Sequence, residues 1–203
     1  MTGGIRSPKP QRLRVDAPVV LALGSNLGDR AATIRAAVTA LDAVAGVRVR
    51  ATSGLVESAA VKLSGVDADA PRYLNAVALA LTTLDPYALL DAVNRIEADF
   101  GRVRAERWGD RTLDIDIVDY DGRRLNDERL TLPHPRAAER AFVLVPWAQL
   151  DPDARLDGHG SVAELAAAVA DDVVAFDGAA GASGASDASE PSEPGAIAGG
   201  EHP

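Results

Sequence analysis

The amino-acid sequence predicts an α+β fold, in which helices pack on one antiparallel sheet. Three observations predict it: short segments of aliphatic and β-branched residues, two longer segments with helix-capping residues, and their order along the chain, which is β-α-β-β-α-β. This βαββαβ order is typical of the split βαβ arrangement of ferredoxin-like domains. With 203 residues, the chain is long enough for one such domain and short for two.

The first half of the chain is expected to contain three strands and one helix. The strands are apolar runs or alternating β-branched segments, and the helix follows a turn in which Asp29 can accept hydrogen bonds from the first free N–H groups. A polar stretch between the second and third strands is expected to be a loop. The expected strands are residues 18–23, 47–57 and 73–82, the helix is residues 30–44, and the loop is residues 58–72.

The second half is expected to add a helix, a strand and smaller elements. Asp85 and Pro86 form a helix start with proline at the first helical position. Asp121 and Gly122 predict a hairpin turn that leads the next strand into a short one. The expected elements are a helix over 86–100, a strand over 112–120, a short strand near 124–125, and short helices over 136–147 and 161–170.

Composition divides the chain into three parts. Residues 1–17 are expected to be a flexible leader and residues 18–176 the folded domain. Residues 177–203 consist mainly of Gly, Ala, Ser, Pro and acidic residues, so they are expected to be a disordered acidic tail. No apolar run reaches the ~18 residues of a membrane span, and no secretory signal is present, so we expect a cytoplasmic protein.

The net charge and the cysteine content exclude several classes of function. The net charge of −9 argues against binding to nucleic acids or anionic membranes. The absence of cysteine excludes disulfides and thiolate metal sites. We expect the protein to be a monomer.

Asp114 and Asp116 are the strongest candidates for chemistry. Residues i and i+2 on a strand share one face, with Cβ atoms roughly 6.5–7 Å apart, so both carboxylates could hold one divalent ion or a close pair of ions. By the same alternation, Asp119 is expected on the opposite face. A strand with one solvated face has the same pattern, so the spacing alone leaves both interpretations open.

Arginines are concentrated around this pair. Ten of the 19 arginines lie between Arg95 and Arg140, which overall arginine usage does not explain. A mobile arginine-rich loop beside metal-binding carboxylates suits phosphoryl transfer, because guanidinium groups neutralise phosphate charge. A solvated connection would be the alternative, but it does not account for a tryptophan there, which is costly to expose. The residues of this loop are Arg102, Arg104, Arg107, Trp108 and Arg111.

His134 lies between two prolines and is a further candidate. A neutral imidazole could donate to a phosphate oxygen, although a single loop histidine is more often a surface residue. Other phosphate and acyl-transfer motifs are absent, since neither GxxxxGK[ST] nor G-x-S-x-G occurs in the sequence.

Several ordered segments together resemble the 6-hydroxymethyl-7,8-dihydropterin pyrophosphokinase family of folate biosynthesis. The resemblance covers about residues 19–170. It implies transfer of pyrophosphate from the co-substrate ATP to the hydroxymethyl group of the pterin, with release of AMP, and two Mg²⁺ ions that bridge the ATP phosphates. The segments are LGSNLG (23–28), YLNAV (73–77), RIE (95–97), GRVR (101–104), ERWG (106–109), RTLDID (111–116) and LPHP (132–135).

The resemblance also implies a role for each matching residue. Catalysis would involve Arg102, Arg111, Asp114 and Asp116, and the two aspartates would also be the metal ligands. The pterin would lie between the rings of Tyr73 and Phe142, with Asn75 at its ring edge and Ser58 and Val61 in the adjoining loop. ATP would be bound by Glu97, Arg104, Arg107, Trp108, Ile117, Leu130, Thr131, His134 and Arg140. Leu130 and Thr131 would meet adenine through backbone groups.

The sequence departs from the family pattern at three places. Ser58-Ala59 stands where many relatives carry Thr-Pro, Asp110 replaces a common proline, and the stretch between Arg104 and Glu106 is one residue shorter than in some relatives.

Two other functions are alternatives. A D-x-D glycosyltransferase would need a larger nucleotide-sugar domain. A non-catalytic ferredoxin-like nucleotide- or RNA-binding module would need exposed aromatic residues and a basic face, whereas this chain is acidic.

Overall fold

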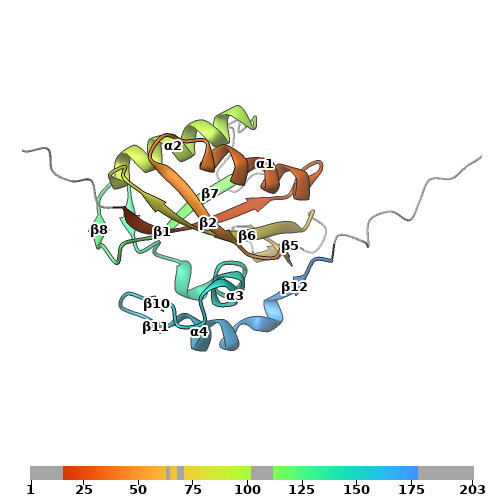
Figure 1. Cartoon of the computed structure of the whole chain (residues 1–203). Coiled ribbons are helices and arrows are strands. Elements are labelled where there is room, and N and C mark those ends of the chain that lie inside the picture. Colours follow the sequence, from red (N-terminus) through yellow and green to blue (C-terminus); the bar gives the residue numbers. More distant parts are fainter. Residues whose placement is uncertain (1–15, 63–64, 68–70, 102–111, 178–203) are drawn as a thin grey trace, which may run out of the picture.

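The centre of the molecule is a six-stranded antiparallel sheet, with strands in the order β12-β3-β6-β1-β7 and with β2 also paired to β6 (Figure 1). The structure is a computed structural model that describes residues 16–62, 65–67, 71–101 and 112–177. The strands of the sheet are β1 (Ala17–Ser25), β2 (Val47–Thr52), β3 (Val56–Ser58), β6 (Tyr73–Thr82), β7 (Asp114–Tyr120) and β12 (Val173–Ala175).

The βαββαβ core expected from the sequence is confirmed. Its strands lie in the order β7-β1-β6-β2, connected through α1 (Arg30–Asp42) and α2 (Pro86–Asp99). Both helices begin as expected: the Asp29 carboxylate accepts from the N–H of Ala32, and the Asp85 carboxylate accepts from the N–H groups of Tyr87 and Ala88. Pro86 occupies the first turn of α2, where its missing N–H leaves no hydrogen bond unmade.

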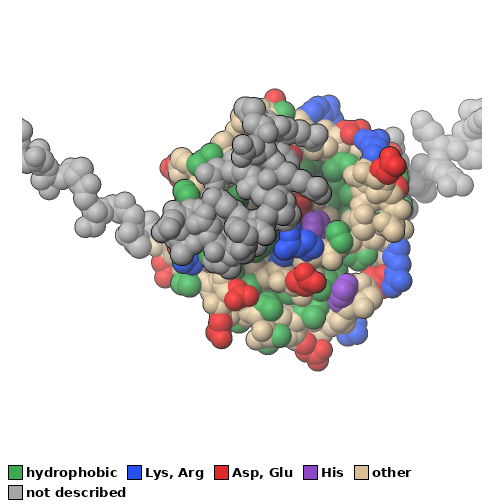
Figure 2. Space-filling model, turned by 180° about the vertical axis from the view of Figure 1, so that it is seen from behind, with side chains coloured by type: hydrophobic (Ala, Val, Ile, Leu, Met, Phe, Trp, Pro, Cys, Tyr) green, Lys and Arg blue, Asp and Glu red, His purple; other side chains and the backbone are tan. Residues whose placement is uncertain are grey.

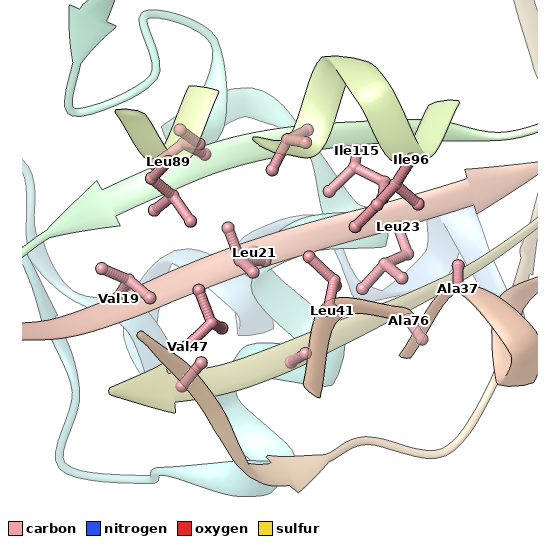
Figure 3. Packing of buried hydrophobic residues seen from close by; sticks show 14 of the residues in the cluster. Val19, Leu21, Leu23, Ala37, Leu41, Val47, Ala76, Leu89, Ile96 and Ile115 are labelled. Carbon is pink, nitrogen blue, oxygen red and sulfur yellow. The ribbon is translucent and has the colours of Figure 1, made fainter. Parts of the chain in front are cut away.

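Helices cover both faces of the sheet (Figure 1). One face packs against α1 and α2, and Figure 3 shows the apolar side chains of β1 meeting those of the two helices. We call this side the α1/α2 face. Its fully or nearly fully buried residues include Val19, Leu21, Leu23, Ile34, Leu41, Leu89, Ile96 and Ile115.

The opposite side, the α3/α4 face, packs against α3 (Ala141–Leu150) and α4 (Val162–Ala168). Here the apolar core is smaller and is centred on Val143, Leu144 and Trp147 of α3. Val20 and Ala22 of β1 contribute to it, while Leu21 and Leu23 point to the other face. Alternate side chains of β1 therefore pack into two different cores.

β7 contains a bulge that the sequence pattern did not reveal. Ile117 pairs with Leu21 and Asp119 pairs with Val20, so Val118 is an extra residue in the ladder. Val118 and Val20 both belong to the α3/α4-side core. The expectation that Asp119 lies on the face opposite Asp116 is therefore wrong, because it assumed unbroken alternation. The Asp119 carboxylate accepts from the N–H of Gly122 in the following turn.

Smaller elements differ from the expected ones in three places. The expected strand over 47–57 is divided into β2 and β3, because Ser53 leaves the ladder and hydrogen-bonds with the backbone of Val77. The expected loop contains the last residue of β3 and a hairpin of β4 (Ala60–Lys62) and β5 (Gly65–Asp67). The turn at Asp121-Gly122 exists, but β8 (Leu125–Asn126) pairs with β9 (Thr131–Leu132) and not with β7.

The remaining elements lie in the last third of the chain. The expected short helices are present as η1 (Ala137–Glu139) followed by α3, and as α4. The sequence did not predict β10 (Arg155–Leu156), β11 (Gly160–Ser161), η2 (Ala170–Asp172) or β12. Within the described ranges, no helix combines the length and the apolar character that a membrane crossing requires.

Candidate functional site

Polar side chains gather where β6, β1 and β7 run side by side on the α3/α4 face. In the register of the sheet, Gly24 of β1 pairs with Asn75 of β6 on one side and with Asp114 of β7 on the other. Two residues earlier on β1, Ala22 pairs with Val77 of β6 and with Asp116 of β7. Directly paired residues project to the same face, so the amide and the two carboxylates flank a strand with almost no side chain.

Asn75 is held firmly in this row. Its side chain is 4% exposed, and its Nδ2 donates to the Oγ of Ser58 over 3.0 Å. Tyr73, two residues earlier on β6, lies on the same face; its ring would lie 3.7 Å from a Cβ placed on Gly24. Ser58, Tyr73 and Asn75, all expected at the pterin, thus lie together.

Asp116, His134 and Arg140 form a charged cluster at the β7 side of the row. Nη1 of Arg140 donates to Oδ2 of Asp116 over 2.8 Å, and Nε2 of His134 lies 3.7 Å from the same oxygen. The three side chains are 17–32% exposed. In Figure 2, basic, acidic and histidine side chains lie together near the centre of the face shown. Arg140 therefore already neutralises one candidate metal ligand.

The hydrogen bonds of His134 define its protonation. The backbone N–H of Arg136 donates to Nδ1, so in the neutral ring the proton is on Nε2, which faces Asp116. Desolvation by burial lowers the pKa of His134 below its usual 6.5, and Arg140 also lowers it, although Asp116 raises it. His134 is therefore a neutral N–H donor aimed at the carboxylate cluster.

Glu97 is buried beneath β7. It is 1% exposed, and its Oε1 accepts from the backbone N–H of Ile115 over 2.8 Å. Ile115 lies between the two candidate metal ligands in sequence, so this bond from α2 fixes the strand segment that carries them. The N–H of Ile115 points away from β1, toward the outer edge of β7 in the described sheet, and Ile117 has the same parity.

The expected adenine-binding positions lie along this edge. The side chain of Ile117 is buried in the α1/α2-side core, so any contact with ATP would have to use its edge-facing backbone. The N–H of Leu130 donates to Oδ1 of Asp127, and its carbonyl oxygen accepts from the N–H of Asp127 over 3.2 Å, so a base could use only the second lone pair of that oxygen. Thr131 lies in β9, where its Oγ1 is 3.5 Å from Oδ1 of Asn126.

Phe142, the second ring expected at the pterin, lies near the charged cluster. It follows Arg140 at the start of α3, and the Arg140 guanidinium carbon is 5.4 Å from the centre of the Phe142 ring. Phe142 is half-buried and packs against the α3/α4-side core. Arg140 thus contacts both a residue expected at the pterin and one expected at the metal.

Six of the residues expected in the site cannot be placed with the others. Arg102, Arg104, Arg107, Trp108 and Arg111 lie outside the described residues. For Val61, only the backbone is described, in β4. The roles expected for these six residues remain predictions from sequence.

The described residues suit Mg²⁺ only in part. Asp114 and Asp116 provide hard oxygen ligands on one face, and Mg²⁺ in nucleotide sites commonly uses one or two carboxylates together with phosphates and water. Within the described ranges, no group of three or more Asp, Glu, His or Cys side chains could hold a metal ion. Such a site would therefore need the oxygens of a bound phosphate chain.

An ion-pair network beside the Ser58 strand was not predicted. Arg30 donates to Oε1 of Glu57 over 2.9 Å and to the carbonyl of Arg72 over 2.7 Å, and Arg72 pairs with Oε2 of Glu57 at 3.2 Å. This network ties β3 to the start of α1. No local motif indicates it, because its members lie far apart in sequence.

Gly24 was also missed as a site residue. In the sequence, Gly24 directly follows the strand expected over residues 18–23 and belongs to the segment LGSNLG, whereas β1 continues through it to Ser25. Glycine weakens a strand interior, and its presence there often marks a close approach of a ligand or another chain segment. That signal was available in the sequence.

Known proteins resemble the folded part of the chain. Residues 20–152 match the family model described as 7,8-dihydro-6-hydroxymethylpterin-pyrophosphokinase. The chain is 46% identical over 139 residues to a 2-amino-4-hydroxy-6-hydroxymethyldihydropteridine pyrophosphokinase of Methylorubrum extorquens, covering 68% of this chain and 85% of the relative. A Pseudomonas aeruginosa protein of the same name is 44% identical over 150 residues, covering 74% and 90%.

A solved structure shares the fold. The crystal structure of Plasmodium falciparum HPPK-DHPS with pterin and p-hydroxybenzoate superimposes with a TM-score of 0.59 at 15% identity. The match covers 77% of this chain and 44% of that one, so the chain spans less than half the length of the solved protein. At this identity the likeness shows the fold alone.

Proposed function

The chain belongs to the 7,8-dihydro-6-hydroxymethylpterin-pyrophosphokinase family, and we propose that it transfers pyrophosphate from ATP to 6-hydroxymethyl-7,8-dihydropterin. The products would be the pterin diphosphate and AMP, in a step of folate biosynthesis. The enzyme would depend on Mg²⁺ and act as a cytoplasmic monomer.

One observation carries the proposal: Asn75 and Asp114 flank β1 at the same register position. An amide beside aromatic rings suits the edge of a heterocycle, and a carboxylate pair suits a metal-bound phosphate chain. The two substrates would therefore meet over β1, each held by a different neighbouring strand.

On the pterin side, the described residues can bind and orient the ring. Asn75 would hydrogen-bond the ring edge, and its hydrogen bond to Ser58 restricts the orientation of its amide. Tyr73 and Phe142 would stack on the two ring faces. Val61 would contribute from the adjoining hairpin. Firm positioning matters because a small misplacement of the acceptor oxygen costs much of the rate.

On the phosphate side, the described residues neutralise charge. Asp114 and Asp116 would hold Mg²⁺, which would supply electrostatic stabilisation for the phosphates. Arg140 would bind phosphate oxygens, exchanging its contact with Asp116 for them, and His134 would donate from Nε2. Glu97 would act as a positioning residue for β7, through its bond to Ile115.

The remaining assignments rest on sequence. Arg102 and Arg111 would stabilise charge during transfer, and Arg104, Arg107 and Trp108 would bind ATP. The backbones of Ile117, Leu130 and Thr131 would contact adenine. Since the acceptor is an alcohol of high pKa, most of the catalysis would come from positioning and charge neutralisation.

Product analysis tests the proposal. The purified protein is incubated with ATP, Mg²⁺ and 6-hydroxymethyl-7,8-dihydropterin, and the nucleotides and pterins are separated. Equal amounts of AMP and pterin diphosphate are expected. Formation of ADP, or the absence of turnover, would refute pyrophosphate transfer, and binding of RNA without turnover would favour the binding-module alternative.

A further inference from the structure

We infer that Gly24 is the position over which the hydroxymethyl group of the acceptor meets the phosphate chain, and that its missing side chain is needed for the acceptor to fit. The inference rests on the proposed function and deepens it, because it assigns a specificity-determining role within that site.

The register of the sheet places Gly24 between the two halves of the site. It is the residue of β1 that pairs with both Asn75 and Asp114. Neighbouring strands lie about 4.8 Å apart, so β6 and β7 are about 10 Å from each other across β1. A ring held by Asn75 and a phosphate held beyond Asp114 can approach to about 3–3.5 Å for reaction only above this intervening strand.

The side chains of β1 on this face become smaller toward the site. They are Val20, Ala22 and then Gly24. Val20 and Ala22 belong to the α3/α4-side core, and the smallest residue lies where the polar row begins. The side chains on this face of the strand thus shrink from valine to none within five residues, and Gly24 itself is buried.

A side chain at residue 24 would disturb the acceptor side first. A Cβ built on Gly24 would lie 3.1 Å from Oδ1 of Asn75, closer than most Cβ contacts, and 3.7 Å from Cδ1 of Tyr73. Asn75 has little freedom to move away, because its Nδ2 is bonded to Ser58. The backbone of Gly24 is not left-handed, so space, not backbone strain, is the reason for glycine here.

The test compares two ligands in Gly24→Ala. Dissociation constants are measured separately for 6-hydroxymethyl-7,8-dihydropterin and for Mg²⁺ with a non-hydrolysable ATP analogue, and kcat is measured with ATP. We expect the pterin constant to rise at least about tenfold and kcat to fall about 100-fold, with the nucleotide constant within about twofold of wild type.

Gly54→Ala is the matched control. Gly54 also has no left-handed backbone, and the nearest atom to its added Cβ would be Oε1 of Gln149 at 3.9 Å, so all three values should remain those of wild type. The inference is overturned if Gly24→Ala changes the pterin constant and kcat by less than about tenfold, or weakens nucleotide binding as much as pterin binding.

A second variant covers the case in which Gly24→Ala does not fold. In an Asn75→Ser background the crowded amide oxygen is gone, so the added methyl group meets no close neighbour there but still occupies the surface. The double variant should turn over at least about tenfold more slowly than Asn75→Ser alone, and equal rates would overturn the inference.

The outcomes separate this inference from the proposed function. If the wild type binds the pterin but releases ADP, pyrophosphate transfer fails, while the comparison of ligand binding in Gly24→Ala still decides the role of Gly24. If the wild type forms AMP and Gly24→Ala does so equally well, the proposed function stands and the role of Gly24 fails.

Discussion

The two faces of the central sheet use the same strands for different purposes. On the α1/α2 face, β1 and β7 contribute Leu21, Leu23 and Ile115 to one continuous core. On the α3/α4 face the same strands carry Gly24, Asp114 and Asp116, and α3 covers the rest. One strand can therefore combine stability and chemistry in alternate residues, so that neighbours in sequence should respond very differently to substitution.

The largest effect is expected on the α3/α4 face. Asp114→Asn and Asp116→Asn each remove a carboxylate charge that would hold Mg²⁺ and, through the ion, the phosphates, so turnover should fall at least about 1,000-fold while the fold remains. Steady-state kinetics and binding of Mg²⁺ with an ATP analogue measure this. Asp119→Asn, which changes the same type of residue on the same strand, is the control. Activity retained in both site variants would refute the metal assignment.

The opposite result is expected one residue away from the site face. Leu21 is fully buried, so Leu21→Ala should lower the free energy of unfolding by about 2–5 kcal/mol. Chemical denaturation measures this change. At a temperature where the variant remains folded, its kcat should be close to that of wild type. A large loss of kcat without a loss of stability would contradict the division between the two faces.

Glu97 connects the two faces of the sheet. It belongs to α2 on one face, and its carboxylate accepts a hydrogen bond from β7, the strand that carries the two aspartates. Glu97→Ala removes the acceptor of the Ile115 N–H and should lower stability by about 1–3 kcal/mol as well as kcat. Glu97→Gln keeps an oxygen acceptor and should recover part of both. Equal losses of stability and kcat in Glu97→Ala and Glu97→Gln would mean that the hydrogen bond to Ile115 does not cause these losses.

Removal of the C-terminal strand β12 should weaken the pterin side of the site more than the nucleotide side. Val173 of β12 pairs with Ser58, the partner of Asn75, so deletion of residues 173–203 should lower stability by about 1–3 kcal/mol and weaken pterin binding more than nucleotide binding. Deletion of residues 178–203 retains β12 and should change neither. Thermal denaturation and the two binding constants compare the truncations, and equal effects of both deletions would contradict the role of β12.

The smallest effect is expected for Asp119. Burial raises its pKa above the ordinary 3.8, so the folded state favours the proton and the charged carboxylate opposes folding at neutral pH. Asp119→Asn, which can still accept from Gly122, should raise stability at pH 7 by at most about 0.5 kcal/mol. The gain should shrink as the pH falls through the raised pKa and below 3.8. A gain that does not depend on pH would contradict this cause.

Local patterns predicted the elements whose signals lie within their own residues. The helix start at Asp85-Pro86 and the strand over residues 73–82 agree with the structure, because capping and alternation act over short distances. β12 was missed, since three residues acquire strand structure only by pairing with β3. Its stabilising partner is more than a hundred residues earlier in the chain.

The candidate site was predictable as a set of residue types, but not in its internal contacts. The resemblance to the family indicated Asn75, Asp116 and Arg140. It did not indicate that Arg140 already contacts Asp116, or that Gly24 separates the two halves of the site. Such relations depend on strand register and on the placement of α3, which no local motif encodes.

The bulge in β7 has a consequence for comparing and engineering related sequences. Asp116 and Tyr120 are four residues apart, yet Asp116 is on the α3/α4 face, while Tyr120 is buried on the α1/α2 side and its hydroxyl donates to the carbonyl of Leu84. Deleting Val118 would remove the bulge and leave Asp116 and Tyr120 three residues apart, a spacing that puts them on opposite faces by regular alternation. Both would keep their sides, and the α3/α4-side core would lose the Val118 side chain. An alignment gap at residue 118 is therefore compatible with the same placement of the site residues, and it marks a difference in core packing.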